Sequence, residues 1–418
     1  MQKAVEPRSR FWRIASAGVL FQGGAAAVDT STIIAALVHG LTGSNFAVGA
    51  AAAIARCGWL APQVIVGHFA QQRRRRLGFY VAGAFGRVAC LAGVAALVAG
   101  VGARPGPAAI AAFFALWSAY AIVSGIVAVP YNDIVARSIA SERRSRMLAI
   151  RFFGGGVLAL GVAVLAARLI DGLAFPLGYA AVIAIAALLL LASALCFVAA
   201  GESDAALPAK PDGGFGAYLR AGMALFGSDR RLRQFVCAQW LGGAVAMALP
   251  FYILQAGSGP DAWSYVALLL GAQTAGALLS NPLWGWWGDV RGKRSLLQAV
   301  AAVGALAPLL MLAWLASERT APALAWFMLV FALLGAAGSG GTIAQLGYLM
   351  EISPDERRPA YSGYFSALVA PAALLPLAGA VVVEAASAAA VFGISALAAV
   401  LQCLAVRRLP DHRTEGNR

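Results

Sequence analysis

The chain has 418 residues, of which 61% are hydrophobic and 12% are charged, and its mean hydropathy is +0.77. This composition excludes an ordinary water-soluble domain and is typical of an integral membrane protein. The formal net charge of +14 would suggest nucleic-acid binding, but the basic residues follow the loops between apolar segments, and we therefore reject that function.

Apolar stretches of about 20 residues, the length that an α-helix needs to cross a bilayer, follow one another along the whole chain. We count twelve, and we therefore predict an all-α integral membrane protein with twelve transmembrane helices. The predicted spans are 14–40, 46–70, 77–101, 107–135, 147–170, 176–200, 233–256, 262–287, 295–316, 322–350, 360–383 and 387–406.

The charged loops indicate the topology. If both termini are cytoplasmic, 27 of the 32 Lys and Arg residues fall on the cytoplasmic side or at its border, whereas the outer side receives Arg104, Arg168 and Arg319. This bias follows the positive-inside rule. We expect a multi-pass protein of the cell inner (plasma) membrane, a location that also fits the preference for Arg over Lys, which is typical of GC-rich bacterial genomes.

Two internal repeats divide the chain into halves. "SERRSRMLAIRFF" (141–153) recurs as "DERRPAYSGYFSA" (355–367), and "GHFAQQRRRRLGF" (67–79) matches "GWWGDVRGKRSLL" (285–297). We predict an N-terminal six-helix half at 1–200, a cytoplasmic linker at 201–232, and a C-terminal six-helix half with a cytoplasmic tail at 233–418. Part of the linker fits either an amphipathic surface helix or a flexible loop.

Catalytic and metal-binding patterns were sought in the same way. The five cysteines show no CxxC or Cys/His spacing, and the three histidines are scattered. No nucleophile elbow or phosphate-binding glycine loop occurs, and the triple glycine at 154–156 is expected to permit close helix packing. We therefore expect no catalytic residues, no metal site and no cofactor, and we do not expect an enzyme.

"GWWGDVRGKR" resembles the G-x-x-x-D-x-x-G-R-[KR]-x motif that follows the second and eighth helices of the major facilitator superfamily. Gly285, Asp289, Gly292, Lys293 and Arg294 match the motif, and Arg291 is an additional base. The first half departs from it, because Gln71 and Arg74 stand where the motif has its acid and a glycine. The resemblance implies two six-helix halves that tilt around a substrate site near the bilayer midplane.

Two charges are expected near that midplane. Asp29 lies roughly 16 Å and Arg56 roughly 15 Å from the outer surface, at about 1.5 Å per helical residue. Because a lone charge at this depth is costly, we predict an ion pair between them, which either joins the first two helices or takes part in substrate binding or proton coupling. Arg87 is a third deep charge, which either faces the cavity or snorkels. Uncharged candidates, each of which could instead form an interhelical hydrogen bond, are Gln22, Tyr120, Gln239, Tyr252, Gln273 and Gln345.

The motif loop itself is predicted to act as a conformational latch, with a topological anchor as the alternative. Asp289 is expected to face the start of the fifth span, where the helix N-terminus and Arg143, Arg144 and Arg146 favour an anion. Arg291 and Arg294 are expected to reach Glu351, and Gly292 to permit a tight turn. The predicted latch comprises Gly285, Asp289, Arg291, Gly292, Lys293, Arg294, Glu351, Arg144 and Arg146.

The function implied by this resemblance is secondary active transport of a small solute by rocker-switch alternating access, with a proton gradient as a candidate driving force. The expected partners are a small-molecule substrate, protons and the lipid bilayer, without nucleic acid, and we expect a monomer. The alternative is a protein of the same fold that does not transport: an assembly factor, a receptor or a lipid-handling protein.

Overall fold

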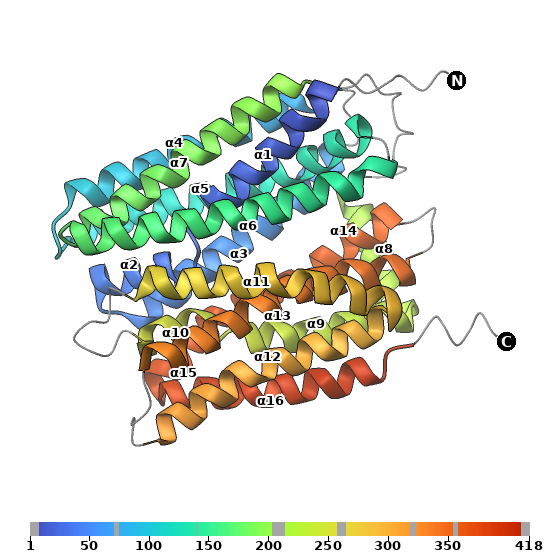
Figure 1. Ribbon diagram of the computed structural model, residues 1–418. Coiled ribbons are helices and arrows are strands. Elements are labelled where there is room, and N and C mark those ends of the chain that lie inside the picture. Colours follow the sequence, from blue (N-terminus) through green and yellow to red (C-terminus); the bar gives the residue numbers. More distant parts are fainter. Residues whose placement is uncertain are drawn as a thin grey trace. The chain divides into compact units, whose positions relative to one another are not determined.

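The computed structural model describes residues 8–70, 75–139, 141–202, 214–256, 265–317, 323–353 and 358–410. All regular secondary structure in these ranges is helical (Figure 1). The chain divides into two compact units, one made of Met1–Gly43 and Ile54–Asp212 and the other of Ser44–Ala53 and Gly213–Arg418. We call them the N-terminal unit and the C-terminal unit.

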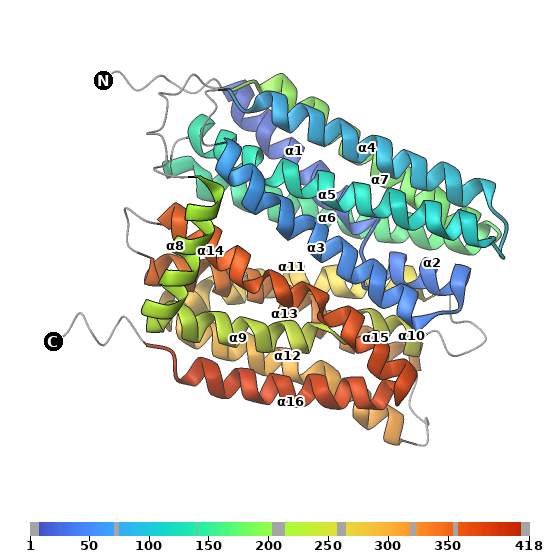
Figure 2. The same ribbon diagram turned by 180° about the vertical axis from the view of Figure 1, so that it is seen from behind.

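The N-terminal unit is a helical bundle in which α1 packs along α6 and α7, and α4 packs along α5 and α7 (Figure 2). Its core includes Phe11, Ile14, Tyr80 and Phe197, all of which are buried. The helices are α1 (Arg8–Ala26), α2 (Ile33–Thr42), the part of α3 (Asn45–Ala70) from Ile54 onwards, α4 (Leu77–Gly100), α5 (Pro107–Ser138), α6 (Ser141–Gly172) and α7 (Leu177–Ala200).

The C-terminal unit repeats this packing. The pairs α9 with α16, α12 with α13 and α12 with α16 correspond to α1 with α7, α4 with α5 and α4 with α7. Its helices are α8 (Phe215–Ser228), α9 (Arg230–Ala246), α10 (Leu249–Ala256), α11 (Val266–Val290), α12 (Lys293–Ala316), α13 (Ala323–Ile352), α14 (Arg358–Val369), the 3₁₀ helix η2 (Ala370–Leu374), α15 (Leu375–Ala385) and α16 (Ala388–Arg407).

The start of α3 belongs to the C-terminal unit, where it packs on α15. The backbone N–H of Phe46 donates to Glu384 Oε1 at 2.9 Å. A methyl group at Gly49 would come within 2.6 Å of Ala380 Cβ, so the glycine permits close approach of the two helices. A carboxylate at a helix N-terminus is favourable because it accepts from otherwise unpaired N–H groups.

In the described residues, ten helical segments are long and apolar enough to cross a membrane. They correspond to the predicted spans from the third to the twelfth. The chain is therefore a multi-pass membrane protein. The first predicted span differs, because α1 ends at Ala26 and α2 begins at Ile33.

Three spans predicted as continuous are interrupted, which corrects the predicted first, seventh and eleventh helices. The first breaks at 27–32, the seventh at Met247–Ala248, and the eleventh at η2. Pro250, Pro371 and Pro376 lie at the last two breaks. Proline lacks an N–H and disfavours helical geometry in the preceding residue, so it interrupts the ladder of helical hydrogen bonds.

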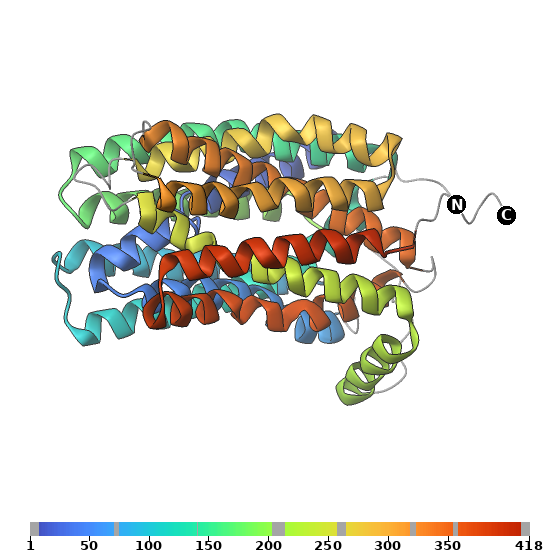
Figure 3. The ribbon, with the colours of Figure 1, turned by 90° about the horizontal axis from the view of Figure 1, so that it is seen from below.

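Part of the predicted linker forms a helix, and residues 203–213 lie outside the described ranges. Helix α8 is turned away from the direction of α9 (Figure 3), and Gly222 lets it approach Tyr364 of α14. Asp229 then caps α9, since its Oδ1 accepts from the N–H groups of Arg231 and Leu232, and its Oδ2 accepts from the Tyr361 hydroxyl at 2.7 Å. Of the two alternatives left open for this part of the linker, the structure shows the helix; its location on the bilayer surface remains a prediction.

Candidate substrate and coupling site

Asp29 lies in the break between α1 and α2 rather than inside a helix. Its Oδ1 accepts from the N–H of Ser31 at 2.9 Å, from the Ser31 hydroxyl at 2.6 Å and from the Thr32 hydroxyl at 2.9 Å. The Asp29 carbonyl accepts from the N–H of Ile34 at 3.0 Å. The carboxylate therefore stabilises the turn that starts α2, as short polar side chains do at helix N-termini.

Arg56 lies on α3 and is half-buried. The predicted Asp29–Arg56 ion pair is wrong: in the part of the chain that the structure describes, Arg56 forms no ion pair or hydrogen bond, and Asp29 is bonded within its own turn. The physical reason is the helix break. It lets the Asp29 side chain fold back onto local donors, whereas the prediction assumed a continuous helix.

The two other candidates in the N-terminal unit contact neighbouring side chains and helices. Gln22 on α1 packs against Gly155 of α6, where a methyl group would come within 2.6 Å of the Gln22 Cβ. The Tyr120 ring stacks on Trp117 of the same helix, with 5.1 Å between ring centres. Gly154 and Gly155 face Val19 and Gln22, so the close packing expected of the triple glycine is confirmed at these two positions.

The remaining candidates lie in the C-terminal unit. Tyr252 on α10 is fully buried against Phe392 of α16, with ring centres 4.9 Å apart, which makes it a core residue of that unit. The backbone of Gln273 on α11 passes close to Gly335 of α13. Gln239 on α9, Gln273 and Gln345 on α13 are half-buried. Their role in a cavity remains a prediction.

The structure also brings together charged residues that were not predicted as a group. Arg87 of α4 is 3% exposed, so it is buried and does not snorkel. Its guanidinium lies 5.0 Å from the ring centre of Phe21 on α1, and the guanidinium of Arg151 on α6 lies 5.6 Å from the same ring. Arg151 also lies over the Tyr131 ring at 5.1 Å and donates to the Tyr131 hydroxyl at 3.2 Å. We call Phe21, Arg87, Tyr131 and Arg151 the arginine cluster.

Arg151 escaped the sequence analysis because the fifth span was predicted to start at residue 147, which places Arg151 among the charges of the membrane border. Helix α6 begins at Ser141, so Arg151 lies ten residues into its helix, as Arg87 does in α4, which begins at Leu77. At about 1.5 Å per residue both lie roughly 15 Å from their helix starts. Ser141 and the charged residues after it signal an earlier helix start. A prediction based on that signal would have placed Arg151 at the same depth as Arg87.

The motif loop of the C-terminal unit forms a tight turn between α11 and α12. Gly292 has φ of 88°, a conformation that L-residues with side chains rarely adopt, which confirms the predicted turn. Asp289 Oδ1 pairs with Lys293 Nζ at 3.0 Å, and the Asp289 side chain is 79% exposed. The Arg291 guanidinium lies 4.6 Å from the Trp287 ring centre.

The other predicted latch residues are only partly described. Arg291 makes no ion pair with the described residues, so its expected contact with Glu351 is not formed, whereas the contact expected between Arg294 and Glu351 remains a prediction. Arg294 Nη2 donates to the Arg407 carbonyl, and Gly285 has open space around it. Arg146 is exposed, and the Arg144 side chain lies outside the described part of the chain. A latch function of these residues remains a prediction.

The start of α4 in the N-terminal unit, which corresponds to the start of α12, is held by two acids: Asp133 on α5 and Glu202, which follows α7. Arg76, buried at the start of α4, pairs with Asp133 of α5, and Asp133 Oδ2 pairs with Arg137 Nε at 2.8 Å. Glu202 accepts from the N–H groups of Arg76 and Leu77 at 2.9 Å each. The sequence analysis missed these contacts, because the acids are distant from the start of α4 in sequence.

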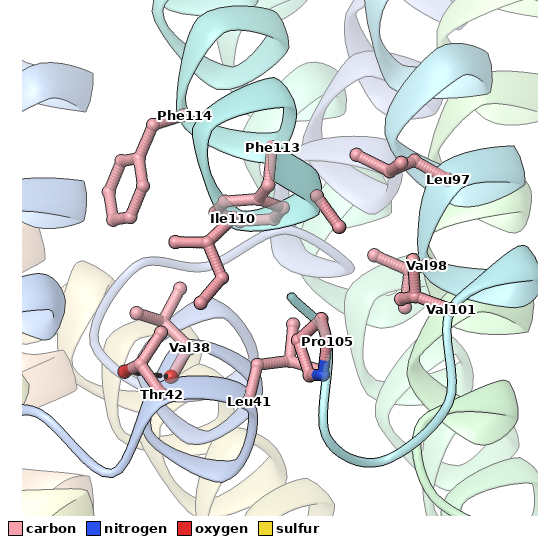
Figure 4. A pocket seen from close by; sticks show the side chains of 11 residues that line it. Val38, Leu41, Thr42, Leu97, Val98, Val101, Pro105, Ile110, Phe113 and Phe114 are labelled. Carbon is pink, nitrogen blue, oxygen red and sulfur yellow. Dashed lines mark hydrogen bonds between the residues drawn. The ribbon is translucent and has the colours of Figure 1, made fainter. Parts of the chain in front are cut away.

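A pocket in the N-terminal unit lies between α2, α4 and α5 (Figure 4). Its lining is apolar except for Thr42, whose hydroxyl donates to the Val38 carbonyl of its own helix at 2.7 Å. Such a lining offers no polar group that could orient a polar solute. No group of three or more His, Cys, Asp or Glu residues that could hold a metal ion occurs within the described ranges.

Comparisons with known proteins agree with this architecture. The family model described as Major Facilitator Superfamily matches residues 234–418, the half in which the loop motif is intact. The fold is that of the major facilitator superfamily. The POT family transporter PepTSo superimposes with a TM-score of 0.75 at 12% identity, covering 95% of this chain and 97% of that one. The D-xylose–proton symporter gives 0.72 at 15% identity, covering 96% and 98%.

The nucleoside transporter NupG is also similar, with a TM-score of 0.68 at 13% identity, covering 96% of this chain and 98% of that chain. No curated protein matches the sequence. At such low identity these structures establish the fold along the whole chain, and they leave the solute to be argued from this chain's own residues.

Proposed function

We propose that the protein is a secondary active transporter that moves a small solute by rocker-switch alternating access. The observation that carries the proposal is the superfamily fold along nearly the whole chain, joined to the family match over residues 234–418. Discontinuous helices at repeat-related positions, α1–α2 and α9–α10, support it. In transporters such breaks occur near substrate and ion sites at the midplane.

Asp29 is our candidate for proton coupling. It is an acid within a broken span, and one of the similar structures is a proton symporter. Intramembrane ionisable residues commonly serve as proton relays. The hydrogen bonds allow a clean test: Asp29→Asn keeps an oxygen that can accept from Ser31 and Thr32 but cannot be protonated, whereas Asp29→Ala removes the acceptor as well.

The first experiment is a screen for thermal stabilisation with nucleosides, D-xylose, dipeptides and small carboxylates. A solute that binds the folded state raises the melting temperature by mass action. The stabilising solute is then tested for uptake into proteoliposomes with and without an inward proton gradient. If Asp29 couples protons, Asp29→Asn loses uphill uptake and retains counterflow exchange. Normal uphill uptake in Asp29→Asn would remove Asp29 from this role.

The location and topology follow from the charge bias, and we propose that both termini face the cytoplasm of an inner-membrane protein. Single cysteines replacing Ser228 and Ser317, in a background without the five native cysteines, should react with an impermeant reagent from opposite sides. Reaction of both from one side would contradict this topology.

The alternative of a non-transporting protein makes a different prediction. An assembly factor would co-purify with a membrane partner, and no solute in the screen would stabilise it or move across the bilayer. No observation on the described residues favours this alternative over transport.

A further inference from the structure

The arginine cluster places two positive charges next to one aromatic ring of the N-terminal unit, and of the two Arg87 is buried and Arg151 half-buried. Arg87 and Arg151 come from different helices, and their guanidinium carbons lie 5.0 Å and 5.6 Å from the centre of the same Phe21 ring. Two like charges that flank one ring and are partly removed from water repel each other. Their convergence therefore needs a compensating group.

No carboxylate in the described residues supplies that compensation. Asp133 is paired with Arg76 and Arg137, Asp29 is bonded in its own turn, and Glu202 caps α4. Arg87 forms no hydrogen bond or ion pair with the described residues, and its Nε is buried without an acceptor. The Nε of Arg151 is likewise buried and without an acceptor. Cation–π contacts recover only part of the cost of burying a charge.

The surroundings of Arg151 are shaped to hold it in this position. A methyl group at Gly18 of α1 would come within 2.7 Å of the Arg151 Cγ and 2.9 Å of its Cδ. The glycine therefore gives the Arg151 stem room to cross the face of α1 towards Phe21. Tyr131 fixes the other end of the side chain through its hydroxyl and its ring.

We infer that Arg87 and Arg151 bind the anionic group of a small organic solute, a carboxylate or a phosphate monoester, and that Phe21 and Tyr131 contact its apolar part. An oxyanion would supply the missing acceptors, and guanidinium groups bind such anions through paired hydrogen bonds. This inference rests on the proposed transport function and names its substrate class.

The unliganded protein provides a test that needs no knowledge of the solute. Because the two charges are uncompensated, Arg87→Met and Arg151→Met should each raise the melting temperature of the purified protein by a few degrees, since a binding site carries a cost in stability. Arg168→Met, on the exposed side of α6, is the matched control and should change it little. A fall of several degrees in both cluster variants would show that the arginines are structural, and would overturn the inference.

The second test uses benzoate and phenyl phosphate as probes, with benzamide as the uncharged isostere of benzoate. At least one of the two anions should raise the melting temperature of the wild type, whereas benzamide should not, and each cluster variant should weaken that anion's affinity at least tenfold. Comparing the two anions distinguishes carboxylate from phosphate. Repeating the melts in nanodiscs with and without phosphatidylglycerol distinguishes a soluble anion from a lipid headgroup. If the anion raises the melting temperature without phosphatidylglycerol but not with it, the inference is overturned.

Transport and melting experiments together distinguish an error in the anion site from an error in the proposed transport function. If the protein transports a neutral solute and Arg87→Met retains that transport at wild-type affinity, the anion site is wrong and the transporter stands. If neither anion stabilises the wild type, the anion site is also rejected, whatever the outcome of the transport assays.

Discussion

Helices α4 and α12 begin after repeat-related sequences, but different contacts hold their starts. The turn before α12 keeps the motif, and its acid Asp289 pairs locally with Lys293 at the exposed surface. The sequence before α4 lacks the acid, yet Arg76 at the start of α4 is buried and paired with Asp133 of α5, and Glu202 caps the helix. The copy with the poorer motif thus has the more buried electrostatic network, so the match to a motif does not measure how firmly the start of the following helix is held.

The largest expected effect tests this buried network. Asp133→Asn leaves Arg76, whose side chain is 6% exposed, without its charged partner. Removing one member of a buried pair commonly costs about 3 kcal/mol or more. We expect a drop of several degrees in the melting temperature, measured in detergent. The exposed neighbour Asn132→Ala should be nearly neutral, and equal melting temperatures for both variants would contradict the comparison.

The second prediction concerns the turn before α12. Gly292→Ala forces an alanine into φ of 88° and ψ of 160°, a region that is nearly restricted to glycine, which should cost about 1–3 kcal/mol. Gly78→Ala in the first turn of α4 is the control, because Gly78 is helical and a methyl group there meets nothing within 4 Å. Thermal melts should show loss of stability in Gly292→Ala and none in Gly78→Ala. A Gly292→Ala variant as stable as the wild type would refute the need for glycine.

A smaller loss is expected from the cap of α4. Glu202→Gln keeps an oxygen for the N–H groups of Arg76 and Leu77 but removes the negative charge at the helix N-terminus. That charge contributes about 0.3–1 kcal/mol at such positions. The variant should melt slightly below the wild type at low salt, and this difference should shrink at high salt, because salt screens the charge of the half-buried carboxylate in the wild type. Salt-independent loss would point to packing instead.

The smallest change in stability is expected at Asp289, although its effect on transport is predicted to be clear. An exposed ion pair contributes about 0–1 kcal/mol, so Asp289→Asn should melt close to the wild type. If the loop acts as a latch, the same variant should transport more slowly with unchanged topology. Lys293→Met breaks the same pair but keeps the acid. Comparing its transport rate with that of Asp289→Asn therefore separates loss of the ion pair from loss of the acid. Wild-type transport in Asp289→Asn would favour a simple anchor.

Hydropathy predicted most of the helices well, because a membrane span needs a long apolar run whatever its partners are. It did not predict the helix breaks, since averaging over about 20 residues conceals a short turn. The segment Asp29–Thr30–Ser31–Thr32 nevertheless contains the residue types that cap helices, and reading them as a cap would have anticipated the turn before α2.

The candidate site was harder to predict. Depth along a helix identified Arg87, but not which side of α4 it occupies, because that side depends on how α4 packs with α5 and α7. Arg151 was misplaced by a helix boundary that was six residues too late. The acids that hold Arg76 were missed because Asp133 and Glu202 are far from it in sequence, and pairing over such distances is decided by the fold.

The break between α1 and α2 also bears on how the chain enters the bilayer during synthesis. Helix α2 has ten residues, which are too few to cross a membrane alone, and Asp29 within the break opposes insertion of an isolated segment by about 2.5–3.5 kcal/mol at the bilayer centre. Non-helical backbone at this depth is tolerated only when protein or water surrounds it. The first span should therefore be retained at the translocon until α6 and α7, which pack on α1, have been synthesised.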